Sequence, residues 1–312
     1  MPSDTSKKYR EIYDKFIVCA SEGVIFRYDI LTDDFVFQPM SHNIHENGVQ
    51  QLGELMRKNL FFYCYGEEEV VERCKDFKNI HQASVYSYRN RAPIRPEKMD
   101  GLPGEVLLDL LIQLFEKDTY KLAVRPLLSQ NRKEELKGYD LAYFTLKNEK
   151  ITIWLGQAKS GGREYCKYGI HEDLLKKFNK EYLTEQMLFV CDRSVKTTDK
   201  CRKIVRIINE LNTATLEVDA AERENLLLDR FKKNDISINI PCLLAYDESR
   251  VYSDPLKLKE EVSNEVENMR KYFSNKRYEF EGFNPNIIFF VFPIKNIDEL
   301  RDNKRGFYSG LR

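Results

Sequence analysis

Two apolar, strand-like runs joined by a short charged turn constrain the fold of this chain more than any other feature of its sequence. Residues 141–146 and 151–156 are rich in β-branched and aromatic side chains, and the charged segment 147–150 lies between them. Two runs of this kind around a short turn are typical of a β-hairpin. We therefore predict an antiparallel hairpin that spans residues 138–159.

The centre of the turn decides which residues face each other across this hairpin. If the turn is centred between residues 148 and 149, paired positions sum to 297, and Asp140 lies opposite Gln157. Directly opposed Cβ atoms are about 4.5–5.5 Å apart, so an acid and an amide there can share one ion. Lys159 is two residues beyond Gln157 and therefore on the same face. A slip of one residue would move each side chain to the other face, so the register is the hypothesis on which the site depends.

The bulk composition indicates a globular protein. The chain has 312 residues, of which 42% are hydrophobic and 32% charged, a length that fits one large domain or one domain with a small appendage. Its most apolar stretch, residues 287–294, has the length of a strand, and its N-terminus lacks the apolar core of a signal peptide. The seven cysteines show no CxxC spacing, which favours free thiols in a reducing compartment. We expect a cytoplasmic protein without a membrane partner.

The charge balance argues against a strong autonomous nucleic-acid binder. The chain carries 50 Lys and Arg against 50 Asp and Glu, whereas phosphate contacts normally require a basic excess. Between residues 121 and 180, however, there are 13 basic against 7 acidic side chains. This local excess surrounds the hairpin, where a phosphate substrate would lie; the alternative is an ordinary solvated helix face.

The rest of the pattern predicts an α/β chain in two parts. Residues 1–88 are expected to form a small N-terminal α+β segment that serves as a partner-binding surface, with strands at 12–20, 23–28 and 34–37 and helices at 49–60 and 67–77. A basic, proline-containing connector at residues 89–96 marks the boundary. Residues 89–312 then read as helix 105–117, strand 121–128, the hairpin, helix 172–182, strand 187–191, helices 198–211 and 220–234, strand 237–246, helix 256–273 and strand 287–292. This order predicts an α/β/α core with a mixed sheet.

Four polar residues in this core suit phosphodiester hydrolysis. That reaction requires charge stabilisation on phosphate oxygens and a deprotonated water, both of which a bound Mg²⁺ supplies through hard oxygen ligands. Asp140 is the natural carboxylate ligand, and Gln157 offers its side-chain oxygen. Lys159 would hold or activate the attacking water and offset developing negative charge. Glu105, from the first turn of the preceding helix, could bind the metal through water or bind a second metal.

Each of these residues also has a simpler interpretation. In this interpretation Glu105 only favours the positive N-terminus of its helix, and Asp140 is a turn residue at the start of a strand. Gln157 and Lys159 would then be exposed residues of an edge strand. The catalytic interpretation is favoured because the features occur together and in this order: an acid on a helix, a second acid at the start of a hairpin, and Gln-x-Lys at its end.

These residues resemble a known motif. Glu105, Asp140 and the run Gln157-Ala158-Lys159 are similar to the PD-(D/E)xK nuclease superfamily, in the variant where glutamine replaces the second acid. The chain also resembles the HamA family, the nuclease subunits of the Hachiman anti-phage system. The resemblance lies in the segments 104–108, 137–140 and 153–159 and in the C-terminal apolar strand. The resemblance covers roughly residues 89–312.

The resemblance implies a restriction-endonuclease-like fold and a defence effector that cuts DNA with Mg²⁺, for which Mn²⁺ can substitute. It also implies a superfamily-2 helicase partner, HamB, that holds the nuclease in check. The chain has no G-x-x-x-x-G-K-[ST] phosphate loop of its own. Gln157 departs from the acid-acid-lysine pattern and should weaken metal affinity. Two alternatives therefore stay open: a restriction-type nuclease outside Hachiman, and a catalytically inactive nuclease fold that acts as a binding module.

Overall fold

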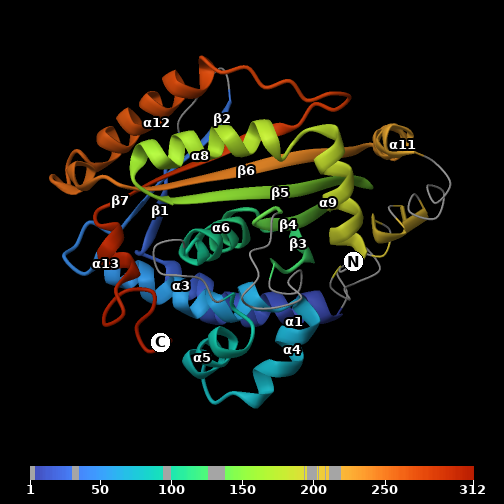
Figure 1. Ribbon diagram of the computed structural model, residues 1–312. Coiled ribbons are helices and arrows are strands. Elements are labelled where there is room, and N and C mark those ends of the chain that lie inside the picture. The colour runs from blue at the N-terminus through green and yellow to red at the C-terminus, as the bar shows by residue number, and fades with distance from the viewer. Residues whose placement is uncertain are drawn as a thin grey trace.

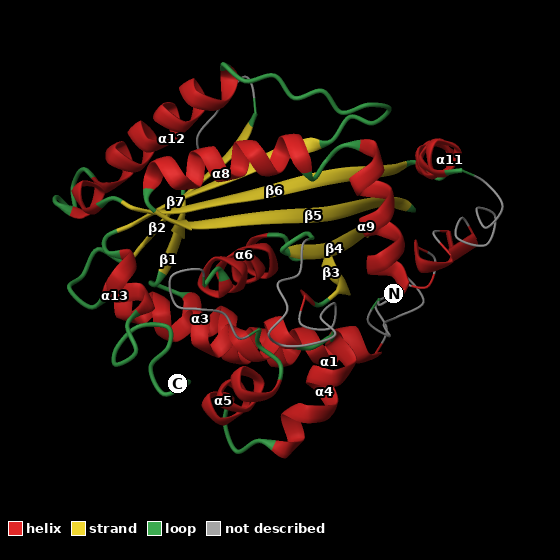
Figure 2. Cartoon of the chain, viewed as in Figure 1, coloured by secondary structure: helices red, strands yellow, loops and turns green. Residues whose placement is uncertain are grey.

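A seven-stranded mixed β-sheet lies between two layers of helices (Figures 1 and 2). The computed structural model describes residues 4–29, 35–93, 100–125, 138–192, 194, 202, 204–207, 209–210 and 219–312. In the figures α8 and α12 lie above the sheet, and α6 and α3 lie below it. The predicted α/β/α architecture with a mixed sheet is confirmed.

The strands and helices of the described residues have the following bounds. The strands are β1 (Ile25–Arg27), β2 (Val36–His42), β3 (Thr119–Ala123), β4 (Leu141–Lys147), β5 (Lys150–Gly161), β6 (Ile236–Asp247) and β7 (Asn286–Ile294). The helices are α1 (Asp4–Tyr13), α2 (Cys19–Ser21), α3 (Gly48–Cys64), α4 (Glu67–Arg73), α5 (Ile80–Asn90), α6 (Leu102–Phe115), α8 (Arg163–Lys176), α9 (Lys180–Asp192), α11 (Ala220–Lys233), α12 (Leu258–Ser274) and α13 (Ile297–Arg301). The sheet order is β1-β2-β7-β6-β5-β4-β3.

The β4–β5 hairpin has the predicted register. Leu141 pairs with Gly156 and Lys147 with Lys150, so the paired positions sum to 297. The two turn residues, Asn148 and Glu149, have φ of 49° and 65°. Positive φ at both positions is the conformation of a type I′ turn, whose twist matches that of the flanking strands. Beyond the hairpin β5 pairs in parallel with β6, and β6 with β7.

Alternation along the strands divides the interior into two cores, one on each side of the sheet. Trp154 of β5 faces the core under the sheet, which α3 and α6 cover, while Ile153 and Leu155 face the core above it, with α8 and α9. The lower core depends on a close approach at Gly156, where an added Cβ would lie 2.8 Å from Leu108 Cδ2 of α6. The first turn of α6 lies beside the end of β5, because a Cβ added at Gly104 would lie 3.2 Å from Ser160 Cβ.

Three predicted elements are wrong. The predicted strand 187–191 lies inside α9, where the buried residues Leu183, Met187 and Val190 follow helical spacing. A short apolar run cannot be assigned to strand or helix by periodicity alone. The predicted strand 12–20 is helical, ending α1 and continuing through a π-helical turn, Asp14–Val18, into α2. The predicted helix 172–182 is the end of α8 and the start of α9; most of the predicted helix 198–211 lies outside the described residues.

The residues before position 89 share their sheet and core with the rest of the chain. Strand β2 pairs in parallel with β7, and α3 packs against α6 within one apolar cluster. The buried ammonium of Lys121 on β3 donates to the carbonyls of Phe62 and Tyr65, at the end of α3. The proposed boundary near residue 89 stays a prediction.

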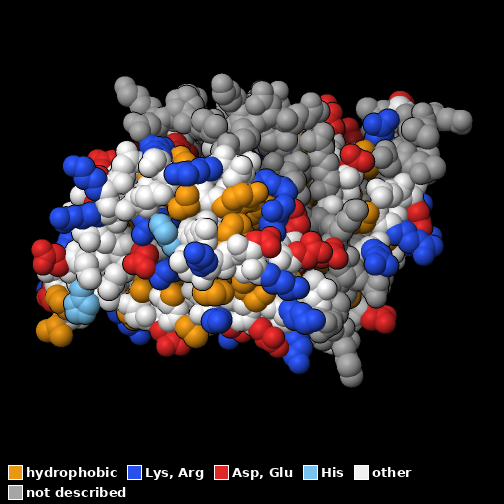
Figure 3. All heavy atoms as spheres, turned by 90° about the horizontal axis from the view of Figure 1, so that it is seen from below, with side chains coloured by type: hydrophobic (Ala, Val, Ile, Leu, Met, Phe, Trp, Pro, Cys, Tyr) orange, Lys and Arg blue, Asp and Glu red, His pale blue; other side chains and the backbone are white. Residues whose placement is uncertain are grey.

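On the lower face of the molecule, basic and acidic side chains are interspersed (Figure 3), unlike a surface of one charge sign, which attracts a phosphate backbone.

Two further expectations concern thiols and membranes. The cysteines that the structure describes are free, as predicted from their spacing. Within the described ranges, no helix combines the length and the hydropathy that crossing a membrane requires.

A buried histidine joins β2 to the end of β7. His42 Nε2 accepts a hydrogen bond from the Lys295 backbone N–H (3.0 Å), so Nδ1 carries the proton and donates to the Asn43 carbonyl (2.7 Å). The ring stacks on Tyr252 with centroids 4.1 Å apart. Burial, aided by the charge of Lys295, lowers the pKa of His42 to about 4.

This pKa shift predicts a pH-dependent stability. Between pH 6.5 and about 4 the unfolded chain binds a proton at His42 that the folded chain does not, so stability is lost as the pH falls through this window. The loss should reach about 3 kcal/mol, at about 1.4 kcal/mol per pKa unit. In urea unfolding across this range, His42→Gln should flatten the dependence, while His45→Gln, at an exposed position, should leave it as in the wild type. Equal slopes for all three proteins would contradict the assignment.

Candidate functional site

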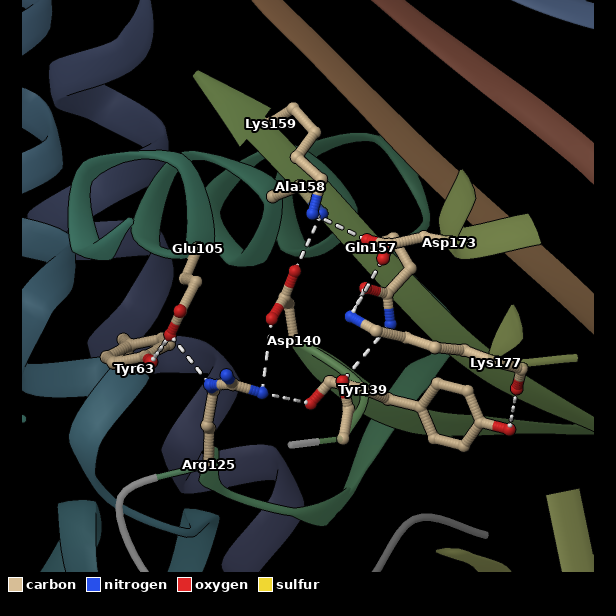
Figure 4. Close-up of polar contacts among 11 residues, drawn as sticks. Tyr63, Glu105, Arg125, Tyr139, Asp140, Gln157, Ala158, Lys159, Asp173 and Lys177 are labelled. Atoms are coloured by element: carbon tan, nitrogen blue, oxygen red, sulfur yellow. Dashed lines mark hydrogen bonds and ion pairs between the residues drawn. The ribbon is translucent and has the colours of Figure 1, made fainter. Parts of the chain in front are cut away.

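The predicted acid, amide and lysine meet at one end of the β4–β5 hairpin (Figure 4). Asp140 directly precedes β4, and its backbone N–H donates to the Gly156 carbonyl (2.9 Å). Its Oδ2 accepts from the Ala158 N–H (2.8 Å), so the carboxylate lies against β5 between Gln157 and Lys159. The structure thus brings together the three hairpin residues that the register predicted.

Gln157 is fully buried and held at both ends of its amide. Its Nε2 donates weakly to the Gly138 carbonyl (3.4 Å), and its Oε1 accepts from Lys177 Nζ (2.7 Å). The oxygen that was predicted to bind a metal ion is therefore in contact with a lysine. Because Gln157 lies in the middle of the sheet, it is not the exposed edge-strand residue of the simpler interpretation.

Lys159 is paired with an acid from the helix that follows β5. Its Nζ lies 2.6 Å from Asp173 Oδ2, and Lys177 Nζ lies 3.2 Å from the other oxygen of Asp173. Burial lowers the pKa of Lys159, but the carboxylates of Asp173 and Asp140 more than offset this, and its pKa lies above the ordinary value. Lys159 is therefore a cation at neutral pH.

Glu105 reaches the site through an arginine. It lies in the first turn of α6, is buried, and accepts from the Tyr63 hydroxyl (2.6 Å). Arg125, just after β3, lies between the two acids: its Nε is 3.0 Å from Glu105 Oε2, and its Nη1 is 3.1 Å from Asp140 Oδ1. Nη1 also donates to the Tyr139 carbonyl (2.8 Å). Arg125 therefore bridges the acid of the helix and the acid of the hairpin (Figure 4).

These contacts settle the charge states at the centre of the site. Burial opposes ionisation of Asp140, but the nearby cations, Arg125 foremost, hold the pKa of its carboxyl below the ordinary value. Burial also opposes the charge of Arg125, but Glu105 and Asp140 raise its pKa overall. The cluster has equal numbers of formal charges of each sign: Glu105, Asp140 and Asp173 against Arg125, Lys159 and Lys177.

The donor atoms suit a hard divalent cation, but each is engaged by the protein. Asp140, Gln157 and Glu105 offer the oxygen ligands that Mg²⁺ prefers. In the described ranges, no three or more His, Cys, Asp or Glu side chains are grouped closely enough to hold a metal ion. An ion held by Asp140 and Gln157 would have to take over contacts now made by Arg125 and Lys177. The residues thus fit the metal in chemical type, at the cost of displacing two internal cations.

Four residues of the cluster were missed by sequence reasoning: Tyr63, Arg125, Asp173 and Lys177. Asp173 and Lys177 carried a usable signal, because they lie four residues apart at the C-terminal end of the helix that follows Gln-x-Lys, with Lys177 as its C-cap. Tyr63 and Arg125 had none, since each is placed by packing between distant elements. His171 lies apart from the cluster, with its Nδ1 3.1 Å from the Tyr278 hydroxyl.

Fold and site together define an α/β protein in which acid, amide and lysine side chains converge at one end of a mixed sheet. A family model described as HamA matches residues 33–310. The chain belongs to the HamA family and is a defence protein of the Hachiman type. No curated protein and no solved structure matches it.

The Arg125 bridge predicts a large stability effect. Arg125→Gln leaves two buried carboxylates without their shared counter-charge, and breaking a buried ion pair costs about 3–5 kcal/mol. Arg163→Gln is the matched control, because Arg163 also bridges two acids, Glu265 (2.8 Å) and Glu248 (3.6 Å), but its side chain is 23% exposed against 9% for Arg125. Chemical unfolding at neutral pH should show the larger loss for Arg125→Gln. A loss no larger than that of the control would mean that Arg125 does not keep the two acids buried.

Proposed function

We propose that this protein is a Mg²⁺-dependent DNA endonuclease, the effector of an anti-phage defence complex that a helicase partner controls. The observation that carries the proposal is the hairpin register, which brings Asp140, Gln157 and Lys159 to one place with Glu105 behind them. Membership of the HamA family supports the defence role. The nuclease chemistry is inferred from the residue types of the site.

The residues divide the work between holding and neutralising. Asp140 and Gln157 would supply carboxylate and amide oxygens to Mg²⁺, and Glu105 a further carboxylate behind them. When bound, Mg²⁺ supplies Lewis-acid stabilisation of a phosphate oxygen and a more acidic water. Lys159 is protonated, so it does not accept the proton of the attacking water; its ammonium offsets the negative charge that develops on the phosphate.

Arg125 and Lys177, the two cations inside the site, would also bind the substrate phosphate. Arg125 and Lys177 now contact the oxygens that a metal ion would take. Once those oxygens are taken, both side chains would exchange their partners for phosphate oxygens. A guanidinium binds such oxygens in a bidentate manner. A metal ion alone would leave Arg125 and Lys177 without their present partners, whereas a phosphodiester bound with it would supply new ones. The cluster would therefore bind the metal and the phosphodiester together more readily than the metal alone.

The partners follow from charge and from family membership. The formal net charge of zero does not favour independent capture of DNA, so delivery by a partner suits this chain. A HamB-like helicase of superfamily 2 is the partner that the family resemblance implies. In such a complex the helicase would act as the motor on DNA, and this chain would cleave the DNA.

A second candidate, an inactive nuclease fold that acts as a binding module, has one observation in its favour. The oxygens expected to bind metal are held by Arg125 and Lys177, and the formal charges of the cluster cancel. Incubating the purified protein with plasmid DNA in Mg²⁺ and in EDTA separates the two candidates. Metal-dependent nicking or linearisation supports the nuclease; intact plasmid in both, with the helicase partner added as well, supports the binding module.

Two alanine variants test the catalytic roles. Gln157→Ala removes a metal ligand and Lys159→Ala removes the ammonium beside the phosphate, and each should lower Mg²⁺-dependent plasmid cleavage by at least about 10²-fold. Lys150→Ala is the matched control, since Lys150 lies at the far end of β5 with its side chain 72% exposed. Cleavage at the wild-type rate by either site variant would overturn the assignment.

A third variant tests the departure at Gln157. Gln157→Glu adds a negative charge beside Asp140, so activity should persist and reach half its maximum at a lower Mg²⁺ concentration. The new carboxylate can still accept from Lys177 but loses the donor to the Gly138 carbonyl. A titration of cleavage against Mg²⁺ measures the shift. Complete loss of activity at every Mg²⁺ concentration would show instead that the amide donor is required.

A further inference from the structure

Helix α8 and its C-cap present three residues, spaced four apart, to the end of β5. Gly169 and Asp173 of α8 and Lys177, which caps its C-terminal end, lie on one side of the helix, because residues four apart are neighbours on a helical surface. Each of them contacts or approaches Lys159 or Gln157, which lie two residues apart on one face of β5. We call these three residues the α8 stripe.

The carboxylate of Asp173 fixes the tip of Lys159. One of its oxygens lies 2.6 Å from Lys159 Nζ and the other 3.2 Å from Lys177 Nζ. Both oxygens are therefore engaged, and the two ammonium groups are held on either side of one carboxylate. Lys177 in turn donates to Gln157 Oε1 (2.7 Å), so Asp173 is linked to the amide as well as to the lysine.

Gly169 fixes the stem of the same lysine. A Cβ added at Gly169 would lie 2.8 Å from Lys159 Cε, 3.0 Å from Cδ and 3.2 Å from Cγ. The Lys159 side chain therefore runs along the bare backbone of α8 before it reaches Asp173. A lysine side chain has many rotamers, and these two contacts select one of them.

We propose that the α8 stripe is the positioning device of the site: Gly169 and Asp173 set the place of the Lys159 ammonium, and Asp173 holds Lys177 beside the Gln157 amide. Asp173 is thus a positioning residue, which acts on the reaction through Lys159. This inference rests on the proposed nuclease function, since it assigns the stripe a role in the same reaction. The competing interpretation is that Asp173 is only a stabilising charge partner of two lysines.

Two variants displace Lys159 from independent directions without changing it. Asp173→Asn weakens the contact at its tip, and Gly169→Ala pushes its stem aside. Because a misplacement of about 1 Å can cost about 10²-fold in rate, each should lower kcat for plasmid cleavage by about 10–100-fold, with little change in KM. Asp173→Glu keeps the charge but moves the carboxylate, and should lower kcat even if Asp173→Asn folds poorly.

Two neighbouring residues provide matched controls. Glu172→Gln removes the adjacent carboxylate of α8, which pairs with Lys176 instead. Gly162→Ala adds a Cβ that meets no atom within 4 Å. Both should cleave within about twofold of the wild-type rate. Full kcat in Asp173→Asn, Asp173→Glu and Gly169→Ala, in a protein whose Lys159→Ala variant is inactive, would overturn the role of the stripe and leave the nuclease assignment standing.

An NMR measurement that does not depend on DNA cleavage distinguishes failure of the positioning role from failure of the nuclease function. Reductive ¹³C-methylation gives each lysine an NMR resonance, and that of Lys159 is the one missing from Lys159→Arg. Asp173→Asn and Gly169→Ala should both shift this resonance, while Glu172→Gln should not. If the wild-type protein does not cut DNA, the nuclease function fails, yet this shift still supports the placement of Lys159; an unmoved resonance in both stripe variants overturns it.

Discussion

The pairing of β4 with β5 is the interaction on which the rest of the site depends. A two-residue turn with positive φ at Asn148 and Glu149 fixes the register, and that register puts the Asp140 carboxylate against the Ala158 N–H. Because the side-chain period of a strand is two, the same register turns Gln157 and Lys159 toward α8. A shift of one residue would turn the side chains of β4 to the opposite face relative to those of β5 and separate Asp140 from Gln157 and Lys159.

The second constraint is electrostatic. Carboxylates as buried as Glu105 and Asp140 require compensation, and Arg125 supplies it to both. Lys159 and Lys177 are compensated in the same way by Asp173. A site with equal numbers of opposite charges is internally compensated, and it has no excess negative charge to attract a divalent cation. Substrate phosphate and metal would have to be accommodated together, with Arg125 and Lys177 changing partners.

The sequence predicted what local chemistry determines. The hairpin, its register, the helix that carries Glu105, and the strands β6 and β7 follow from turn residues and periodicity. Residues 187–191 were misassigned because a short apolar run suits a buried helix face as well as a strand. Arg125 could not be placed from sequence, since its position depends on where β3 ends and on a register shift between Lys121 and Ala123. Asp173 could have been predicted, because Gly169, Asp173 and Lys177 are spaced four residues apart in the sequence.

The proposed mechanism requires that Asp140 and Gln157 bind one divalent cation together. A crystal structure of the protein soaked in Mn²⁺ tests it directly, because the anomalous signal locates the ion. We expect a peak at about 2.2 Å from an oxygen of each residue, since these are distances at which oxygen ligands bind such ions, with the Arg125 guanidinium moved away from Asp140. A peak elsewhere, or an Arg125–Asp140 bridge that persists at saturating Mn²⁺, would contradict it.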